Sequence, residues 1–459
     1  MHTNRIRHSL IIMVAGAFFG ILCTSLMNVA LPVLMKDFHI GTAEVQWVSN
    51  GFVMMNALMI PISAYFIKRW SFRRLFIIFL GIFIVGTAIG AIAPNFPILV
   101  CGRMVQAIGA GMMMPLVNVL AMNYALPGQQ GRVNGVIGLA FNCSPIFGPV
   151  VSGVILKFLP WRWLFIFILP FTIIIFICAC VLMPEIPHKA HPRFNTVGLI
   201  TVTIGLFALL NGLSDISTNS FLSFDVLGYM IIGLVFLGIF VVTQNRSDHP
   251  LVYLKVFSNQ QFRIATIINM LIVATMYGNS ILIPLLVQNV QHQSTIISAL
   301  TIFPGACLTG LLSTTSGRFY DKYSIRVLVT TGLTIDMIGT ICQCLIGSQS
   351  STLMVTIFQT VRQLGLVTML IPIMTQAETS VPLKELPDAV ATFNTLRQVA
   401  ASLGTALIVG TIGIVDNFVG NSNSSRGIQG GFAVAFILLC IAMTLAPQLK
   451  HNPQQHLSK

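Results

Sequence analysis

The sequence predicts an all-α integral membrane protein with fourteen membrane-spanning helices. Of its 459 residues, 55% are hydrophobic and only 8% are charged. Stretches of about 20 mostly apolar residues, the length that a helix needs to cross a bilayer, recur along the whole chain. Because the bilayer core offers no water to unpaired backbone groups, stretches of this length must be helices. The spans are predicted to begin near Ser9, Glu44, Arg74, Pro97, Val133, Trp161, Thr196, Asp225, Phe262, Ser294, Arg326, Ser351, Pro387 and Ile428.

The loops predict the orientation of these spans. If the N-terminus is cytoplasmic, most loop lysines and arginines lie on the cytoplasmic side, and the opposite loops hold only Lys36, Lys157, Arg162 and Arg426. This asymmetry is typical of the positive-inside rule and, with an even number of spans, places both termini in the cytoplasm. We therefore expect a multi-pass protein of the cell (cytoplasmic) membrane. The net charge of +13 reports topology and not nucleic-acid binding, which would need a basic soluble domain.

All nine cysteines fall within apolar spans, and the nine histidines lie in loops or tails. We expect no disulfide framework, no metal site and no cofactor. The Walker pattern that binds nucleotide phosphates is absent from the sequence, so transport is expected to draw on the proton motive force and not on ATP.

A weak internal repeat organises the chain into two halves. The basic turn that begins near Ala64 recurs at Gly317, 253 residues later, and Arg103 recurs as Arg362, 259 residues later. Parallel repeats of this kind occur in transporters that rock two bundles about a midplane site. We predict an N-terminal six-helix bundle over 1–186, an inserted two-helix segment over 187–258, a C-terminal six-helix bundle over 259–449, and a cytoplasmic tail over 450–459.

Four motifs carry a resemblance to a known family. The first span ends in Met27-Asn-Val-Ala-Leu-Pro32, the fourth carries Arg103-x-x-Gln106, and Trp161-Arg-Trp163 opens the sixth. The fifth span has a stripe of small residues and one proline, at Gly135, Ser144, Gly148, Pro149, Ser152 and Gly153. Together they resemble the major facilitator superfamily, and specifically its fourteen-span drug:proton antiporters of the multidrug efflux type. The similarity runs essentially end to end, although Ala107 and the two serines replace glycines that are usual in the family.

The resemblance implies the major facilitator fold, with two six-helix bundles and two extra inserted helices. It also implies proton-coupled efflux of drug-like compounds by alternating access, and with it antibiotic resistance. The stripe in the fifth span would be the antiporter hinge, because small residues let helices approach closely and Pro149 bends the backbone. Ordinary tight helix packing explains the same pattern.

The resemblance also implies that Arg103 and Gln106 couple protons or substrate, and a structural clamp for helix carbonyls is the alternative. Arg362 and Arg397 are second-half counterparts or supplements. The resemblance does not assign the coupling carboxylate, because Cys23 occupies the position where fourteen-span antiporters that export cations often carry an aspartate. The candidates are Asp336, Glu378, Asp388 and Asp416. Asp336 is the deepest, and we expect it to be either a proton carrier or a locally paired polar residue.

The basic turns would act as electrostatic latches on the cytoplasmic side. The residues concerned are Lys68 and Arg69 in the first copy, and Gly317, Asp321, Lys322 and Arg326 in the second. Asp321 is expected to pair with Lys322, Arg318 or Arg326. Lys68 occupies the acidic position of the family motif, so the first copy cannot form the same ion pair, and topological anchoring explains its cations equally well.

A cavity between the bundles would be lined by polar and flexible side chains of both halves. The candidates are Asn28, Phe52, Asn56, Met112, Met113, Met114, Asn118, Asn142, Asn269, Tyr277, Asn279, Gln359 and Gln363. Methionine suits a site that repacks around different ligands, although methionines in membrane helices also serve packing or face lipid.

We therefore expect export of amphipathic compounds in exchange for protons. The missing acid in the first span predicts a preference for neutral, zwitterionic or anionic compounds over dications. A dedicated transporter of one metabolite, possibly by proton symport, is the alternative. A membrane-embedded enzyme or a sensor is disfavoured, because neither convergent catalytic groups nor a soluble signalling domain is present in the sequence. The expected partners are small-molecule substrates, protons and membrane lipid, and we expect a monomer.

Overall fold

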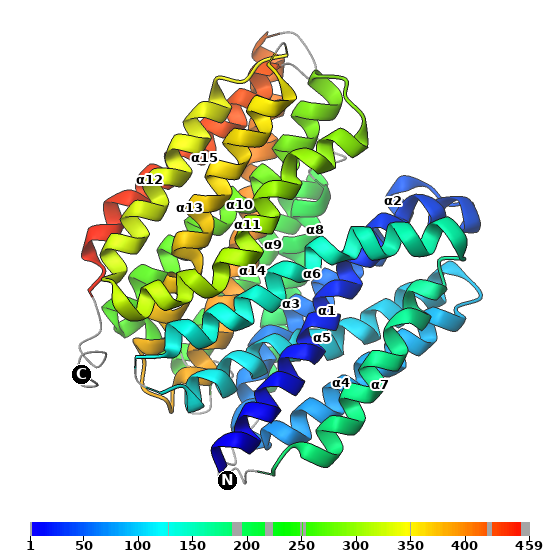
Figure 1. The fold of residues 1–459 in the computed structure, drawn as a ribbon, viewed down its shortest axis with the longest axis vertical. Coiled ribbons are helices and arrows are strands. Elements are labelled where there is room, and N and C mark those ends of the chain that lie inside the picture. Colours follow the sequence, from blue (N-terminus) through cyan, green and yellow to red (C-terminus); the bar gives the residue numbers. More distant parts are fainter. Residues whose placement is uncertain are drawn as a thin grey trace.

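The computed structural model describes residues 2–126, 128–185, 195–215, 224–247, 250, 254–348, 350–419 and 425–450. Within these residues the chain is helical throughout (Figure 1). The long helices of the first half are α1 (His2–Phe38), α3 (Trp47–Arg69), α4 (Phe72–Ile92), α5 (Phe96–Tyr124), α6 (Gln130–Phe158) and α7 (Trp163–Leu182).

Two helices follow that belong to neither half, α8 (Thr196–Asp215) and α9 (Phe224–Arg246). The second half consists of α10 (Gln260–Leu285), α11 (Thr295–Lys322), α12 (Ile325–Cys344), α13 (Thr352–Thr379), α14 (Leu386–Val419) and α15 (Ser425–Leu445). Four short elements complete the described chain, namely α2 (Thr42–Val45), η1 (Leu254–Ser258), η2 (Leu286–Val290) and η3 (Ala446–Gln448).

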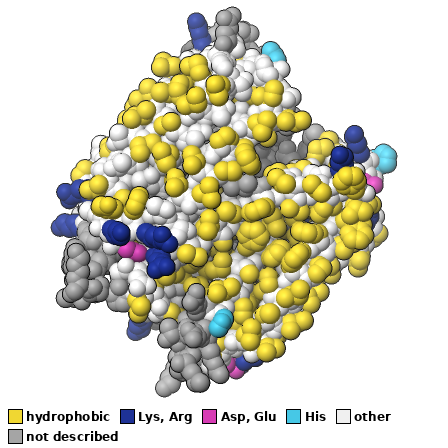
Figure 2. All heavy atoms as spheres, viewed as in Figure 1, with side chains coloured by type: hydrophobic (Ala, Val, Ile, Leu, Met, Phe, Trp, Pro, Cys, Tyr) yellow, Lys and Arg dark blue, Asp and Glu magenta, His cyan; other side chains and the backbone are white. Residues whose placement is uncertain are grey.

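These helices confirm the predicted fold class. Thirteen of the described helices are long and apolar enough to cross a membrane, and in α8 the described apolar stretch is the shorter Thr196–Leu209. One boundary differs from expectation, because Glu44 belongs to the separate turn α2 and the second span begins at Trp47. Hydrophobic side chains cover the middle of the visible face, and Lys and Arg side chains lie near its ends (Figure 2). This distribution suits a protein whose middle is surrounded by lipid.

Helices α1 and α3–α7 pack on one another, as do α10–α15, and the two groups meet along two seams. In the first seam α6 lies against α11, and in the second α3 lies against α14. Helix α8 packs on α3 and α14, and α9 packs on α8. The residue boundaries of the bundles and the inserted segment stay a prediction.

The chain begins and the described part ends at the same end of the helices, which we call the terminus side, at the lower left of Figure 1. From there the two halves diverge toward the upper right of the view. Among the described residues, hydrogen bonds and ion pairs between the halves lie only between the terminus side and the middle of the helices. The molecule is therefore in a state that is closed on the terminus side.

Small residues on two faces of α6 set these contacts. Toward the terminus side, Gly135 lies so close to α11 that an added Cβ would be 2.8 Å from the carbonyl oxygen of Ser313. Farther along, Ser144 and Ser152 lie against α1, where their hydroxyls donate to the carbonyls of Phe18 and Leu26, both at 3.0 Å. The serines that replace glycines thus keep the close packing and satisfy their own hydroxyls. Gly148 packs on Ser25 of α1, whereas Pro149 is exposed.

The two glycines at the ends of the stripe allow a matched test of this packing. We expect Gly135→Ala to destabilise the protein by about 1–3 kcal/mol, because the new methyl group overlaps the α11 backbone. Gly153 has no atom within 4 Å of an added Cβ. Gly153→Ala should therefore leave stability unchanged or slightly raised. Thermal unfolding of both variants in detergent measures the difference, and equal midpoints would contradict the close α6–α11 contact.

Candidate functional site

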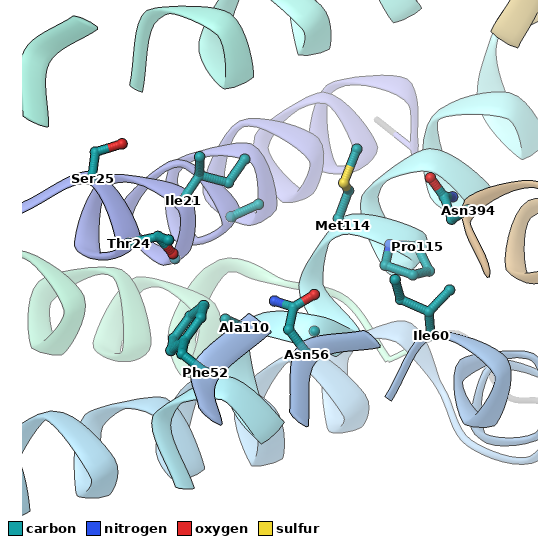
Figure 3. A pocket seen from close by; sticks show the side chains of 13 residues that line it. Ile21, Thr24, Ser25, Phe52, Asn56, Ile60, Ala110, Met114, Pro115 and Asn394 are labelled. Carbon is teal, nitrogen blue, oxygen red and sulfur yellow. The ribbon is translucent and has the colours of Figure 1, made fainter. Parts of the chain in front are cut away.

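A cavity of about 260 Å³ lies at mid-height of the first half and faces the second. It is lined by α1, α3 and α5, and α14 contributes Asn394. In Figure 3, Thr24 and Ser25 of α1 lie on one side, and Phe52 and Asn56 of α3 lie opposite. Its chemistry is apolar with a few amide, hydroxyl and thioether groups, which is typical of small-molecule sites. The thirteen residues that line it include no acidic side chain.

Arg103 lies behind this cavity and is fully buried. Its guanidinium lies 4.2 Å from the ring centroid of Phe52, and its Nη1 donates to Gln106 Oε1 at 2.6 Å and to Cys23 Sγ at 3.1 Å. Its Nε donates to the carbonyl of Val48 at 3.3 Å. No carboxylate of the described chain pairs with this guanidinium, because none lies within ion-pair distance of it. The Arg103 guanidinium thus lies on the far side of the Phe52 ring from the cavity.

The buried arginine of the second half is held by a different set of partners. Thr87 accepts from Gln106 Nε2 at 2.8 Å, and Thr340, 253 residues later, accepts from Arg362 Nε at 3.3 Å. Arg362 also pairs with Asp336 at 3.1 Å, and both side chains are buried. The structure thus gives Asp336 a local partner within the α12–α13 pair. In the first half the equivalent position 253 residues earlier is Phe83.

A second, smaller space of about 50 Å³ continues from Met114 toward the terminus side. Asn134, Asn142, Asn269 and Arg397 line it, so it lies between the halves. Its volume suits one or two water molecules. Asn142 donates to Ser313 Oγ of α11 at 3.0 Å, and Asn134 donates to Glu378 Oε2 of α13 at 2.7 Å.

Glu378 is thus a buried carboxyl group at a contact between the halves. It is 4% exposed, and no Lys or Arg of the described residues lies within ion-pair distance of it. A buried carboxyl with no cation is costly in its charged form. The Asn134 contact thus joins α6 of the first half to α13 of the second.

The latch residues occupy two pseudo-equivalent corners of the terminus side. At one corner Lys68 of α3 forms an ion pair with Asp388 of α14. At the other, Asp321 of α11 accepts from the backbone N–H groups of Gly131 and Arg132 at the start of α6, both at 2.9 Å. Lys68 and Asp321 are 253 residues apart, so equivalent positions carry opposite charges.

This geometry corrects the expected partners of Asp321 and gives Lys68 a partner that the sequence did not predict. Asp321 contacts the N-terminus of α6, where unpaired N–H groups attract an anion, and not the cations of its own turn. Lys68, the cation that occupies the acidic position of the family motif, pairs across the seam with Asp388, 320 residues away. Arg69 donates to Tyr65 on its own helix. Gly317 lies against the backbone of Gly131, and Lys322 and Arg326 lie at the exposed turn between α11 and α12.

The other predicted cavity residues are divided among several places. Phe52, Asn56 and Met114 line the central cavity, whereas Met112 and Met113 are buried, Met113 beside Gly16. Asn118, one turn beyond Met114, is buried, and neither of its polar atoms has a partner among the described residues.

Asn28 is exposed and accepts from Ser49 Oγ at 2.8 Å. In the second half Gln359 accepts from Asn279 and Gln343, which ties α10, α12 and α13 together. Gln363 packs against Gly305, and Tyr277 is 41% exposed. The side chain of Asp416 lies outside the described residues. Asn394 and Asn134 were not predicted from the sequence. Nothing local distinguishes them from the other asparagines of the chain, and only the fold places them at the contact between the halves.

Two packed six-helix halves with a cavity at mid-height between them are the architecture typical of membrane transporters with internal repeats. Residues 13–405 match the family described as Major Facilitator Superfamily. The chain therefore belongs to the major facilitator superfamily.

Its relatives include drug-resistance transporters. It is 30% identical to the lincomycin resistance protein LmrB of Listeria innocua, over 93% of each chain. It is 28% identical to the multidrug export protein EmrB of Haemophilus influenzae, over 85% of this chain and 78% of that protein. Among solved structures, the human organic anion transporter MFSD10 matches with a TM-score of 0.68 and 13% identity, over 95% of this chain and 99% of that one. That likeness concerns the fold alone.

The ion pair between Lys68 and Asp388 should stabilise the α3–α14 seam. Because Asp388 is only 2% exposed, Lys68→Ala removes a cation from a buried carboxylate and should weaken the seam. We expect faster hydrogen exchange at the end of α3 and the start of α14, measured by mass spectrometry. The double swap Lys68→Asp with Asp388→Lys should restore protection.

The control is Arg74→Ala, whose ion pair with Glu185 is exposed on both sides. It should change exchange at the α3–α14 seam little, since exposed pairs contribute about 0–1 kcal/mol. Equal exchange in Lys68→Ala and Arg74→Ala would show that Lys68 serves topology alone.

Proposed function

We propose that the protein exports amphipathic, drug-like small molecules across the cytoplasmic membrane in exchange for protons, by alternating access. The observation that carries the proposal is the central cavity, whose apolar walls hold a few amide and hydroxyl groups and no carboxylate. Such a lining can accept varied compounds, since Met114 can adapt its shape and Asn56 and Asn394 can donate or accept hydrogen bonds. The drug-export relatives add support.

The charges near the cavity favour some substrates over others. Arg103 stands behind Phe52, and Arg397 lines the smaller space toward the terminus side. A cationic substrate would meet these positive charges with no acid in the cavity lining to offset them. We therefore propose that the protein prefers neutral, zwitterionic or anionic compounds to dications.

Among the candidate acids, Glu378 is best placed to couple a proton to the movement. Its hydrogen bond with Asn134 joins the halves, so its surroundings must change when the terminus side opens. A group whose surroundings differ between two states binds protons differently in each, so proton binding and opening are thermodynamically linked. The small space beside Asn134 provides a route for water from the central cavity.

The remaining acids have other roles in this proposal. Asp336 stabilises Arg362 within the second half, and Asp388 closes a seam through Lys68. The terminus side is proposed to be cytoplasmic, because Lys68, Arg69, Arg73, Arg74 and Arg132 lie there. The bundles 1–186 and 259–449 would then move against each other in a monomer, with 187–258 as the insert.

Dye export from energised cells tests the proposal. We expect efflux of a neutral dye such as N-phenyl-1-naphthylamine and of an anionic dye, with a dication such as propidium exported at least about tenfold more slowly. A protonophore should abolish efflux. Glu378→Gln should lower energised efflux at least about tenfold, because the amide cannot bind and release a proton.

Asp336→Asn is the matched control, since it also removes a buried carboxylate but away from the seam. After correction for the amount of folded protein, it should keep most of the protonophore-sensitive efflux. Equal losses in the two variants would contradict the role of Glu378. Exclusive export of dications, or efflux that ignores the protonophore, would contradict the proposed function.

A further inference from the structure

A second cavity lies outside the central site, between the inserted helices and the α3–α14 seam. Its volume is about 360 Å³, within the range of about 300–1,000 Å³ that is usual for small-molecule sites. Helices α8 and α9, α3, α14 and the turn η1 all contribute to its walls. Most of the lining is apolar, including Val202, Leu206, Leu237, Phe240, Leu396 and Val399.

One polar group in this cavity has no partner. Thr392 of α14 is only 5% exposed, and its Oγ1 makes no hydrogen bond within the described chain. A buried hydroxyl without a partner is unfavourable by roughly 1–3 kcal/mol. An apolar molecule with one hydrogen-bonding group would satisfy both the walls and this hydroxyl.

Only the seam separates this cavity from the central one. On α3, Ile60 lines the central cavity and the next residue, Pro61, lines the second cavity. On α14, Asn394 lines the central cavity and Thr395 the second. These two helices are also the ones that Lys68 and Asp388 join at their terminus-side ends. Separation of α3 from α14 would therefore connect the two cavities.

The second cavity also reaches the surface that faces lipid. Val241 of α9 lines it and is 45% exposed. The lining residues of α9 and α14, such as Phe240 and Thr395, lie within a few turns of the terminus-side ends of these helices. The cavity is thus level with the leaflet on the terminus side, where amphipathic molecules accumulate from the adjacent water.

We propose that this cavity is an access site, at which an amphipathic molecule from the terminus-side leaflet binds before the α3–α14 seam admits it to the central cavity. The ligand class is a compact apolar ring system or chain with one hydrogen-bonding group that pairs with Thr392. The inference rests on the proposed export function. It gives the inserted helices α8 and α9 a role, as the outer wall of the access site.

The test is binding of N-phenyl-1-naphthylamine, which has fused rings and one N–H group, to the purified full-length protein in detergent. Because Leu206 is buried and lines the cavity, Leu206→Trp should fill it and remove this binding site, so that the only dye bound per protein is what the central cavity holds. Thr392→Val keeps the shape and removes only the hydroxyl, so it should weaken binding about fivefold. The matched control is Ile200→Trp on the lipid-facing side of α8, where the side chain is 52% exposed, and it should bind like wild type.

Each outcome separates this inference from the proposed function, because binding in detergent needs no proton gradient. Loss of binding in Leu206→Trp and Thr392→Val, with slower export of the same dye from cells, would support the access site. Wild-type stoichiometry and affinity of the dye in both variants would overturn it, even if export proceeds. A phospholipid that wild type retains and Leu206→Trp loses, seen by native mass spectrometry, would also overturn it in favour of a structural lipid. If the two variants lose dye binding at this cavity but the wild-type protein exports no compound, the binding site would be upheld and the export function refuted.

Discussion

Polar groups buried between the two halves must satisfy one another, because the bilayer around them supplies no water. Asn134 with Glu378, Lys68 with Asp388, and Asp321 with the start of α6 meet this requirement on the terminus side. Each contact is made only while the halves are together. The same groups therefore stabilise the closed state, and under the proposed alternating access they would have to be hydrated when it opens, as in a two-state element.

The rest of the architecture follows from this seam. The small residues of α6 let its backbone approach α11 and α1 closely enough for side chains to meet across the halves. With the terminus side closed, the central cavity is left between α1, α3, α5 and α14 at mid-height. Arg103 and Arg362 are held away from the seam by partners within their own halves, so neither contributes to closure.

Much of the fold could be predicted from the sequence, because hydropathy and loop charge are local signals. The candidate membrane spans begin within a few residues of the predicted positions, and a separate turn around Glu44 precedes the second span. The pairing of Arg103 with Gln106 was also accessible, since three residues on a helix place both side chains on one face. By contrast, whether Met113 or the adjacent Met114 faces the cavity depends on the rotation of α5 about its axis, and composition does not determine that rotation.

The cross-seam contacts could not be predicted in the same way. Lys68 lies 320 residues from Asp388, and Asn134 lies 244 residues from Glu378. Only the packing of α3 on α14 and of α6 on α13 brings these groups together. For the same reason the charge reversal at Lys68 indicated a lost latch in the sequence, whereas the structure supplies the missing acid from the other half.

The most direct test of this account is a pair of distances measured by pulsed electron spin resonance on full-length protein in lipid nanodiscs. Labels carried by genetically encoded amino acids, which leave the nine cysteines in place, would join positions 129 and 384 on the terminus side and positions 95 and 293 on the opposite side. Between about pH 5.5 and about pH 8.5 we predict opposite changes of the two distances in wild type, and neither change in Glu378→Gln. The same pH response in wild type and Glu378→Gln would contradict the central claim that this carboxyl group links proton binding to the seam.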